Sequence, residues 1–491
     1  MDQSLKSRTA RTIKWNVIDR VASQVLYAVT GVVLARLLST DDFGLVGAVL
    51  VFQAFASLLV DSGFSYALIQ RKQPTQTDYS TVLWFNLAVA VAIYAVLYFC
   101  APFIADCFQG DRRLIPLSRV MFLSFILNAS AIVQTNRLMK RMDVKMVAVS
   151  NSLGLVVAAV VGIWLAVTGY GAWAIVWQTI TLAAVKSLVL WTTQRWLPSP
   201  VFSWAALRSF FGIGSRMMLT SFLNTLFLNI YSFFIGNRVG MTPLGYYTQS
   251  DKWSKMGIMS LSQVLTSSFL PTLSAVQDDS ERFLRACSKM NRFTAYLLFP
   301  AMIGLMVTAT PIFHTLFGTK WDPSIILFQL LLFRGIFTVL IGLYNNFLLA
   351  RGHARTIMWM EVLRDSVALA ALFATLPFMA DTRPGNPVWG LEILLWGQIA
   401  ASVVTWAATL IFTVKKTGAT LWNFLRDLAP YLCLTLAIVP VMMLLGSVIA
   451  NPLLALLAEG AVALALYIGA NALAGSQIQR DALDFLRHKK N

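Results

Sequence analysis

The chain has 491 residues, of which 57% are hydrophobic and only 12% charged, and its mean hydropathy is +0.68. This composition excludes an ordinary soluble protein and indicates a polytopic membrane protein. The formal net charge of +17 would favour a nucleic-acid partner only if membrane topology did not account for the basic residues. The four cysteines have no metal-ligand spacing and are interpreted as apolar packing residues.

The first predicted span, residues 12–38, is a membrane-length helix with charged groups in its body. A spanning helix needs about 20 mostly apolar residues. The basic start of the chain has no small-residue cleavage site, so we expect an anchor and not a cleaved signal peptide. At helical spacing, one face collects Asn16, Asp19, Arg20, Ser23, Gln24, Tyr27 and Thr30.

Arg20 is the main candidate for function on this face. An arginine at membrane depth costs at least about 2.5–3.5 kcal/mol on insertion scales, so it should face a cavity or a partner. In one interpretation Asp19 or Asp61 neutralises Arg20, which then only holds helices together. In the other, Arg20 contacts an anionic substrate, with Asn16 and Gln24 as neutral binding groups beside it.

Hydropathy predicts an all-α protein with fourteen spans. The spans are residues 12–38, 43–68, 80–105, 114–136, 146–168, 171–194, 208–237, 244–270, 292–316, 324–350, 356–380, 388–414, 428–450 and 453–474. The eighth is the least regular, because Asp251 and Lys252 lie in its polar first half.

Basic residues alternate between the two sides of the predicted topology. Of the 39 lysines and arginines, 25 fall in loops on one side and 7 on the other, which leaves 7 inside spans. The positive-inside rule then places both termini in the cytoplasm and requires an even number of spans. Topology therefore explains most of the positive charge, and no nucleic-acid partner is expected.

An internal repeat predicts two related halves. At a shift of 201 residues, RLLSTDDFGL at 36–45 aligns with NRVGMTPLGY at 237–246, and a second match occurs at a shift of 211. We expect six-helix bundles at 1–200 and 201–415, two further helices at 416–474 and an amphipathic cytoplasmic tail at 475–491. Bundles in the same orientation would enclose a central cavity and give alternating access by rocking.

The sequence has no P-loop, no nucleophile elbow, no histidine cluster and no loop long enough for a catalytic domain. We therefore expect no enzymatic activity, no metal and no cofactor. Ionisable residues at membrane depth remain, and several cations together suit a phosphate or pyrophosphate. The candidates in the second half are Arg216, Lys252 and Arg334, with Asn224 as a polar counterpart of the first helix.

Three carboxylates, Asp19, Asp61 and Glu361, are candidates for H⁺ or Na⁺ coupling, which the sequence does not decide. Glu361 has a second interpretation. It lies three and four residues before Arg364 and Asp365, so the three side chains can simply pair on one helix.

Two segments, LARLLSTDDFGL at 34–45 and LVDSGFSYALIQRK at 59–72, together with the Arg20 helix, resemble the Wzx-type polysaccharide exporters. These belong to the multidrug/oligosaccharidyl-lipid/polysaccharide (MOP) superfamily, and the likeness is to the colanic-acid-exporter-like branch. The resemblance implies a flippase that moves undecaprenyl-pyrophosphate-linked oligosaccharides from the cytoplasmic to the outer leaflet of the bacterial inner membrane.

The family's cationic cavity is lined partly by helices one, two, seven and eight, which carries over to Arg20, Asp61, Arg216 and Lys252. A polysaccharide polymerase and a chain-length regulator are the protein partners that the resemblance suggests. Two rival functions remain, a cation antiporter of the same superfamily and a membrane glycosyl-lipid polymerase or ligase. The first would favour a cavity rich in carboxylates, and the second would need larger outward loops.

Overall fold

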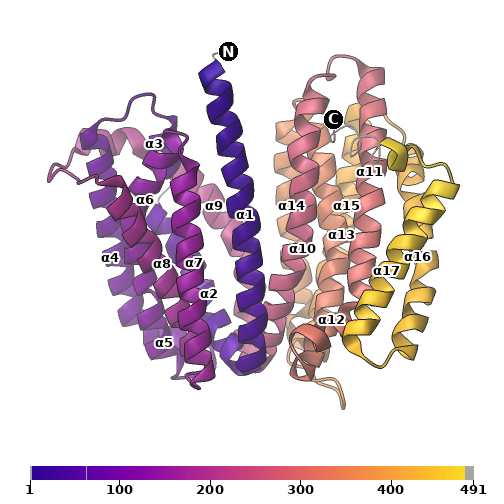
Figure 1. Ribbon diagram of the computed structural model, residues 1–491, viewed down its shortest axis with the longest axis horizontal. Helices are drawn as coiled ribbons and strands as arrows, with labels where there is room; N and C mark the ends of the chain where they lie inside the picture. The colour runs from indigo at the N-terminus through magenta and orange to yellow at the C-terminus, as the bar shows by residue number, and fades with distance from the viewer. Residues whose placement is uncertain (1–2, 62–63, 482–491) are drawn as a thin grey trace. The chain divides into compact units, whose positions relative to one another are not determined.

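The computed structural model describes residues 3–61 and 64–481, and within these ranges the regular elements are all helices. In hydrocarbon, backbone polar groups must be bonded within the chain, and a helix satisfies them inside one segment. By contacts the chain forms two compact units, Met1–Gly245 and Tyr246–Asn491. Figure 1 draws the first in indigo to magenta and the second in orange to yellow.

Within its described residues, the first unit contains nine complete helices. They are α1 (Gln3–Leu37), α2 (Thr40–Asp61), α3 (Phe64–Gln70), α4 (Gln76–Cys107), α5 (Leu114–Met121), α6 (Leu123–Lys140), α7 (Val144–Val167), α8 (Trp173–Gln194) and α9 (Trp204–Arg238). The first turn of α10 (Met241–Ser274) also belongs to this unit.

Helix α7 is central to the packing of the first unit, because it contacts both α8 and α1. Gly154 brings α7 close to α8, and a Cβ built there would lie 3.1 Å from the Leu182 side chain. At the end of α1, Leu34 and Leu38 are buried against Leu165 of α7. The α1 helix is thus held along one face by α7.

Up to residue 481, where the described residues end, the second unit contains the rest of α10 and seven further α-helices. These are α11 (Ser280–Val307), α12 (Ala309–Leu316), α13 (Asp322–Ala350), α14 (Ala354–Thr375), α15 (Trp389–Thr417), α16 (Leu421–Val448) and α17 (Pro452–Leu473). Helix α13 packs on α11 and α15, and α16 packs on α11 and α17. The fully buried side chains of Trp321, Tyr344 and Phe347 fill the core around α13.

The expected spans fall on helices, but 43–68, 114–136 and 292–316 each cover parts of two α-helices, and residues 62–63 of the first lie outside the described residues. Eleven helical stretches in the described part of the chain are long and apolar enough to cross a membrane. Helices α9, α10 and α14 are outside that group, and α10 and α14 carry clusters of ionisable residues. The all-α membrane architecture is confirmed, whereas the count of fourteen is not.

The predicted division into halves at residue 200 stays a prediction. The contact-defined units divide at residue 245 because α9 packs on α2, α3 and α4 of the first unit. Of the predicted amphipathic tail, residues 482–491 lie outside the described residues.

Candidate functional site

The polar face of α1 is divided between a side packed against α7 and an exposed side. On the packed side, Asn151 of α7 donates from Nδ2 to Ser23 Oγ at 2.9 Å and to Asp19 Oδ1 at 3.3 Å. Ser23 Oγ also lies 3.4 Å from the same Asp19 oxygen. Lys186 of α8 is near enough to interact electrostatically with Asp19. The Asp19 carboxylate therefore belongs to a polar cluster joining α1 and α7.

Arg20 lies on the exposed side of α1. Its side chain makes no hydrogen bond or ion pair with any residue in the described ranges. Asn16, one turn earlier, is also exposed, and Gln24, one turn later, is partly buried. Neutralisation of Arg20 by Asp19 is not seen, and the Asp61 side chain lies outside the described residues. The geometry thus favours a cation available to a ligand.

Two predicted cations lie in the second unit. Arg334 of α13 donates from Nη1 to Gln398 Oε1 of α15. The Gln398 Nε2 group is buried and has no hydrogen-bond partner among the described residues. Lys252 of α10 is exposed, with Nζ 5.5 Å from the ring centroid of its neighbour Trp253. Lys252 and Arg334 both have N–H donors left for a ligand. Their role in substrate binding stays a prediction.

Glu361 of α14 is paired on its own helix. Its Oε2 lies 2.5 Å from Arg364 Nη1, and Arg364 Nη2 lies 2.9 Å from Asp365 Oδ1. Asn345 of α13 donates to Glu361 Oε1 at 3.5 Å. The predicted pairing of these three side chains on one helix is confirmed, and a role for Glu361 in ion coupling stays a prediction.

Among the other candidates, Asn224 is exposed on α9, and the side chain of Arg216 lies outside the described residues. Two amides that contact the candidates, Asn151 and Gln398, were not predicted. The sequence signal for Asn151 was the polar Ser-Asn-Ser sequence inside an apolar span. A neutral amide at membrane depth is a weaker indicator of function than a charge, because the free energy of burying it is smaller.

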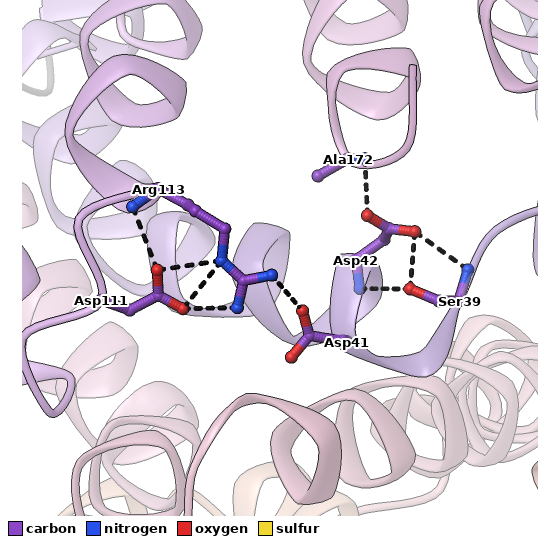
Figure 2. A network of polar contacts seen from close by, with 6 residues as sticks. All are labelled: Ser39, Asp41, Asp42, Asp111, Arg113 and Ala172. Carbon is purple, nitrogen blue, oxygen red and sulfur yellow. Dashed lines mark hydrogen bonds and ion pairs between the residues drawn. The ribbon is translucent and has the colours of Figure 1, made fainter. Parts of the chain in front are cut away.

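A polar network ties three helix ends together in the first unit (Figure 2). Asp42 Oδ1 accepts from the backbone N–H of Ala172 at 2.8 Å, which joins the start of α2 to the turn before α8. Asp42 Oδ2 accepts from the backbone N–H and hydroxyl of Ser39 at 2.9 and 2.6 Å. The backbone N–H of Asp42 in turn donates to Ser39 Oγ at 3.1 Å, which completes a cap on α2.

Arg113 extends the network to the loop between α4 and α5. Its Nη1 lies 2.6 Å from Asp41 Oδ2, and its Nη2 lies 2.6 Å from Asp111 Oδ2 (Figure 2). The Arg113 hydrogen bonds lower the pKa of the Asp111 carboxyl below its ordinary value. The resulting stabilisation is present above the ordinary carboxyl pKa and is lost as the pH falls through the lowered pKa.

Replacing Asp42 by alanine is expected to lower the free energy of unfolding by about 2 kcal/mol, because a helix cap and a charged hydrogen bond are lost together. Thermal unfolding of the purified protein measures this as a lower Tm. Asp106→Ala is the matched control, since Asp106 is exposed near the same loop and has no ion pair within the described residues. Equal Tm values for the two variants would contradict a stabilising role for the network.

Comparison with known proteins identifies the family. Residues 33–326, more than half of the chain, match the polysaccharide biosynthesis protein family, so the chain belongs to that family. The succinoglycan biosynthesis transport protein ExoT of Rhizobium meliloti is 24% identical over 100% of this chain and 98% of its own. The lipopolysaccharide biosynthesis protein WzxC of Escherichia coli is 26% identical over 68% of each chain.

Among solved structures, the lipid II flippase MurJ in an inward closed conformation superposes with a TM-score of 0.72. It is 15% identical, and the match covers 95% of this chain and 100% of MurJ. An inward-facing multidrug transporter of the MATE family and MOP superfamily gives 0.60 at 15% identity, covering 81% and 96%. This likeness shows the fold.

The resemblance to a polysaccharide biosynthesis family is confirmed, and the protein is a multi-pass membrane protein. The relative ExoT is named as a transport protein, which agrees with the expectation that the chain is not an enzyme.

Proposed function

We propose that the chain is a flippase for undecaprenyl-pyrophosphate-linked oligosaccharide repeat units, which it moves from the cytoplasmic to the outer leaflet of the bacterial inner membrane. Exopolysaccharide or O-antigen biosynthesis would use the product. The family and the relatives named for succinoglycan and lipopolysaccharide biosynthesis support this substrate class. The observation that carries the proposal is Arg20, an exposed and unpaired cation in a membrane helix, judged within the described residues.

The chemistry of α1 suits such a ligand. A guanidinium binds a pyrophosphate with two parallel hydrogen bonds, so Arg20 supplies both charge and orientation. The amides of Asn16 and Gln24, one turn to either side, offer donors and acceptors to sugar hydroxyls. In this proposal Arg216, Lys252, Arg334 and Asn224 complete a cationic central cavity, and rocking of the two halves gives alternating access.

The driving force follows from charge. The cytoplasm is electrically negative, so outward movement of an anion is favoured by about 2.3 kcal/mol per charge per 100 mV if the protein's own charges stay fixed. Coupling to H⁺ or Na⁺ at Asp19 is a further part of the proposal, since its carboxylate already lies within a polar cluster of α1 and α7. Asp61 and Glu361 are the other coupling candidates.

The direction of transport rests on the proposed orientation. The excess of basic residues in alternate loops of the predicted topology supports a cytoplasmic position for both termini. The undecaprenyl lipid then enters from the leaflet where its oligosaccharide is assembled. A polysaccharide polymerase and a chain-length regulator would act on the product beyond the outer leaflet.

A cation antiporter is the second candidate, and the likeness to a multidrug transporter fold favours it. Proteoliposomes containing the purified chain separate the two functions. We expect a labelled undecaprenyl-pyrophosphate oligosaccharide to cross the bilayer and a cationic dye not to be exchanged for H⁺ or Na⁺. Dye exchange without lipid movement would replace the proposed function by the antiporter.

A further inference from the structure

Two polar cavities adjoin one another in the second unit, beside the start of α11, the start of α16 and the end of α17. Their volumes are about 590 and 610 Å³. Both are lined by Ser288, Arg292, Pro430 and Tyr431. Because they share these four residues, we treat them as one depression and call it the polar groove.

Basic side chains outnumber acidic ones in the polar groove. The basic residues are Arg285, Lys289, Arg292 and Arg426, and the acidic residues are Asp427 and Asp481. The first turn of α16 also lines the groove, and the positive end of a helix dipole lies there. Lys289 is paired with Asp481 and Arg285 with Glu281. The attraction of the polar groove for an anion therefore comes from Arg426, the exposed side of Arg292 and the helix end.

Asp427 holds one of these cations in place. It is only 5% exposed, and it accepts from Arg292 Nε at 2.6 Å and from Ser288 Oγ at 2.7 Å. This pair fixes Arg292 at the groove wall while its terminal nitrogens remain available. Arg426 is exposed and has no hydrogen bond or ion pair with the described part of the chain. Arg426 is thus the cation with the most freedom to bind a ligand.

An apolar cavity of about 540 Å³ lies between the same three helices. Pro300 and Gly304 of α11, Met442 of α16 and Gly460 of α17 are among its lining residues. Tyr296 lines this cavity, and its ring lies 5.8 Å from that of Tyr431, which lines the polar groove. One set of helices, neighbours in Figure 1, therefore presents a charged region next to an apolar one.

We propose that this surface binds an anionic glycerophospholipid, with the phosphate in the polar groove and one acyl chain in the apolar cavity. A phosphate suits the guanidinium of Arg426 and the accessible edge of Arg292. A soluble phosphate would leave the apolar cavity unused, and an uncharged lipid would leave the cations unmatched. The site lies wholly within the second unit and does not depend on the proposed transport function.

Titration of the full-length protein in detergent with phosphatidylglycerol tests the proposal, with lipid binding followed by native mass spectrometry. Phosphatidylethanolamine and glycerol 1-phosphate are the comparison ligands. We expect phosphatidylglycerol to bind at least tenfold more tightly than either. Equal binding of phosphatidylethanolamine would overturn the role of charge, and equal binding of glycerol 1-phosphate would overturn the role of the acyl chain.

Two variants locate the site. Arg426→Gln is expected to weaken phosphatidylglycerol about tenfold, as loss of one charge-assisted hydrogen bond predicts, and Arg426→Lys should recover part of the affinity. Gly460→Leu fills the apolar cavity, because a Cβ at Gly460 meets no atom within 4 Å. It should weaken phosphatidylglycerol and leave glycerol 1-phosphate unchanged.

The control is Arg355→Gln, an exposed arginine at the start of α14 outside the groove. It alters net charge as Arg426→Gln does and should bind phosphatidylglycerol like the wild type. Equal weakening in Arg355→Gln and Arg426→Gln would mean that overall charge, and not this groove, attracts the lipid. Tighter binding of undecaprenyl phosphate than of phosphatidylglycerol would also overturn the assignment.

Discussion

Arg20→Ala is expected to weaken binding of an undecaprenyl-pyrophosphate oligosaccharide by ten- to a hundredfold. Each hydrogen bond to a charged group contributes about 1.5–3 kcal/mol, and about 1.4 kcal/mol corresponds to a factor of ten in affinity. Arg20 has no competing partner in the described ranges, so little local packing is lost with it. Titration of the detergent-solubilised protein with the labelled lipid measures the change.

Two further variants separate charge from geometry at Arg20. Arg20→Lys keeps the positive charge and loses the planar pair of donors, so its affinity should lie between wild type and Arg20→Ala. Arg112→Ala, at an exposed arginine in the loop after α4, alters net charge elsewhere and should bind normally. If folded Arg20→Ala bound the lipid as tightly as wild type, Arg20 would be only a structural residue.

Gly44→Ala and Gly245→Ala are expected to prevent accumulation of folded protein in the membrane. A Cβ at Gly44 would lie 1.8 Å from the backbone oxygen of Met241, and a Cβ at Gly245 would lie 1.9 Å from that of Thr40. Real Cβ atoms do not approach so closely, and backbone cannot move aside as a flexible side chain can. The first turns of α2 and α10 therefore need glycine where they cross.

The two contacts are reciprocal in the internal repeat. Met241 lies 201 residues after Thr40, and Gly245 lies 201 residues after Gly44. The approach of Gly44 to Met241 is therefore matched, at the repeat-related positions, by the approach of Gly245 to Thr40. Both substitutions should consequently have similar effects. The yield and the size-exclusion profile of each variant, compared with wild type, measure them.

Gly342→Ala is the matched control for the glycine variants. A Cβ at Gly342, in the middle of α13, would meet no atom within 4 Å. Alanine is a better helix former than glycine by about 1 kcal/mol, so this variant should be as stable as wild type or more stable. Wild-type yields for Gly44→Ala and Gly245→Ala would contradict the close backbone crossing.

The positions of the helices could be predicted from the sequence because apolar length is a local property. Interruptions of the helix within a predicted span were harder to predict. The predicted span 292–316 is divided at Thr308, between α11 and α12. Pro311 has no N–H to donate to the carbonyl of Val307, so a local signal for that break was present.

The sequence predicted which candidate residues share a helix face. It did not predict the contacts that these residues make with other helices. Asn151 lies 132 residues after Asp19, and no periodicity in either helix identifies that pairing. The repeat likewise aligned Gly44 with Gly245 without indicating that their helices touch. Such contacts depend on tertiary packing, which a single sequence does not contain.

The most direct test of the central claim is flipping of a labelled undecaprenyl-pyrophosphate oligosaccharide in proteoliposomes under an imposed membrane potential. We expect that the wild type moves the lipid, that a potential negative on the donor side accelerates movement, and that Arg20→Ala slows it at least tenfold. Well-folded wild-type protein that moves no lipid would contradict the proposed flippase function.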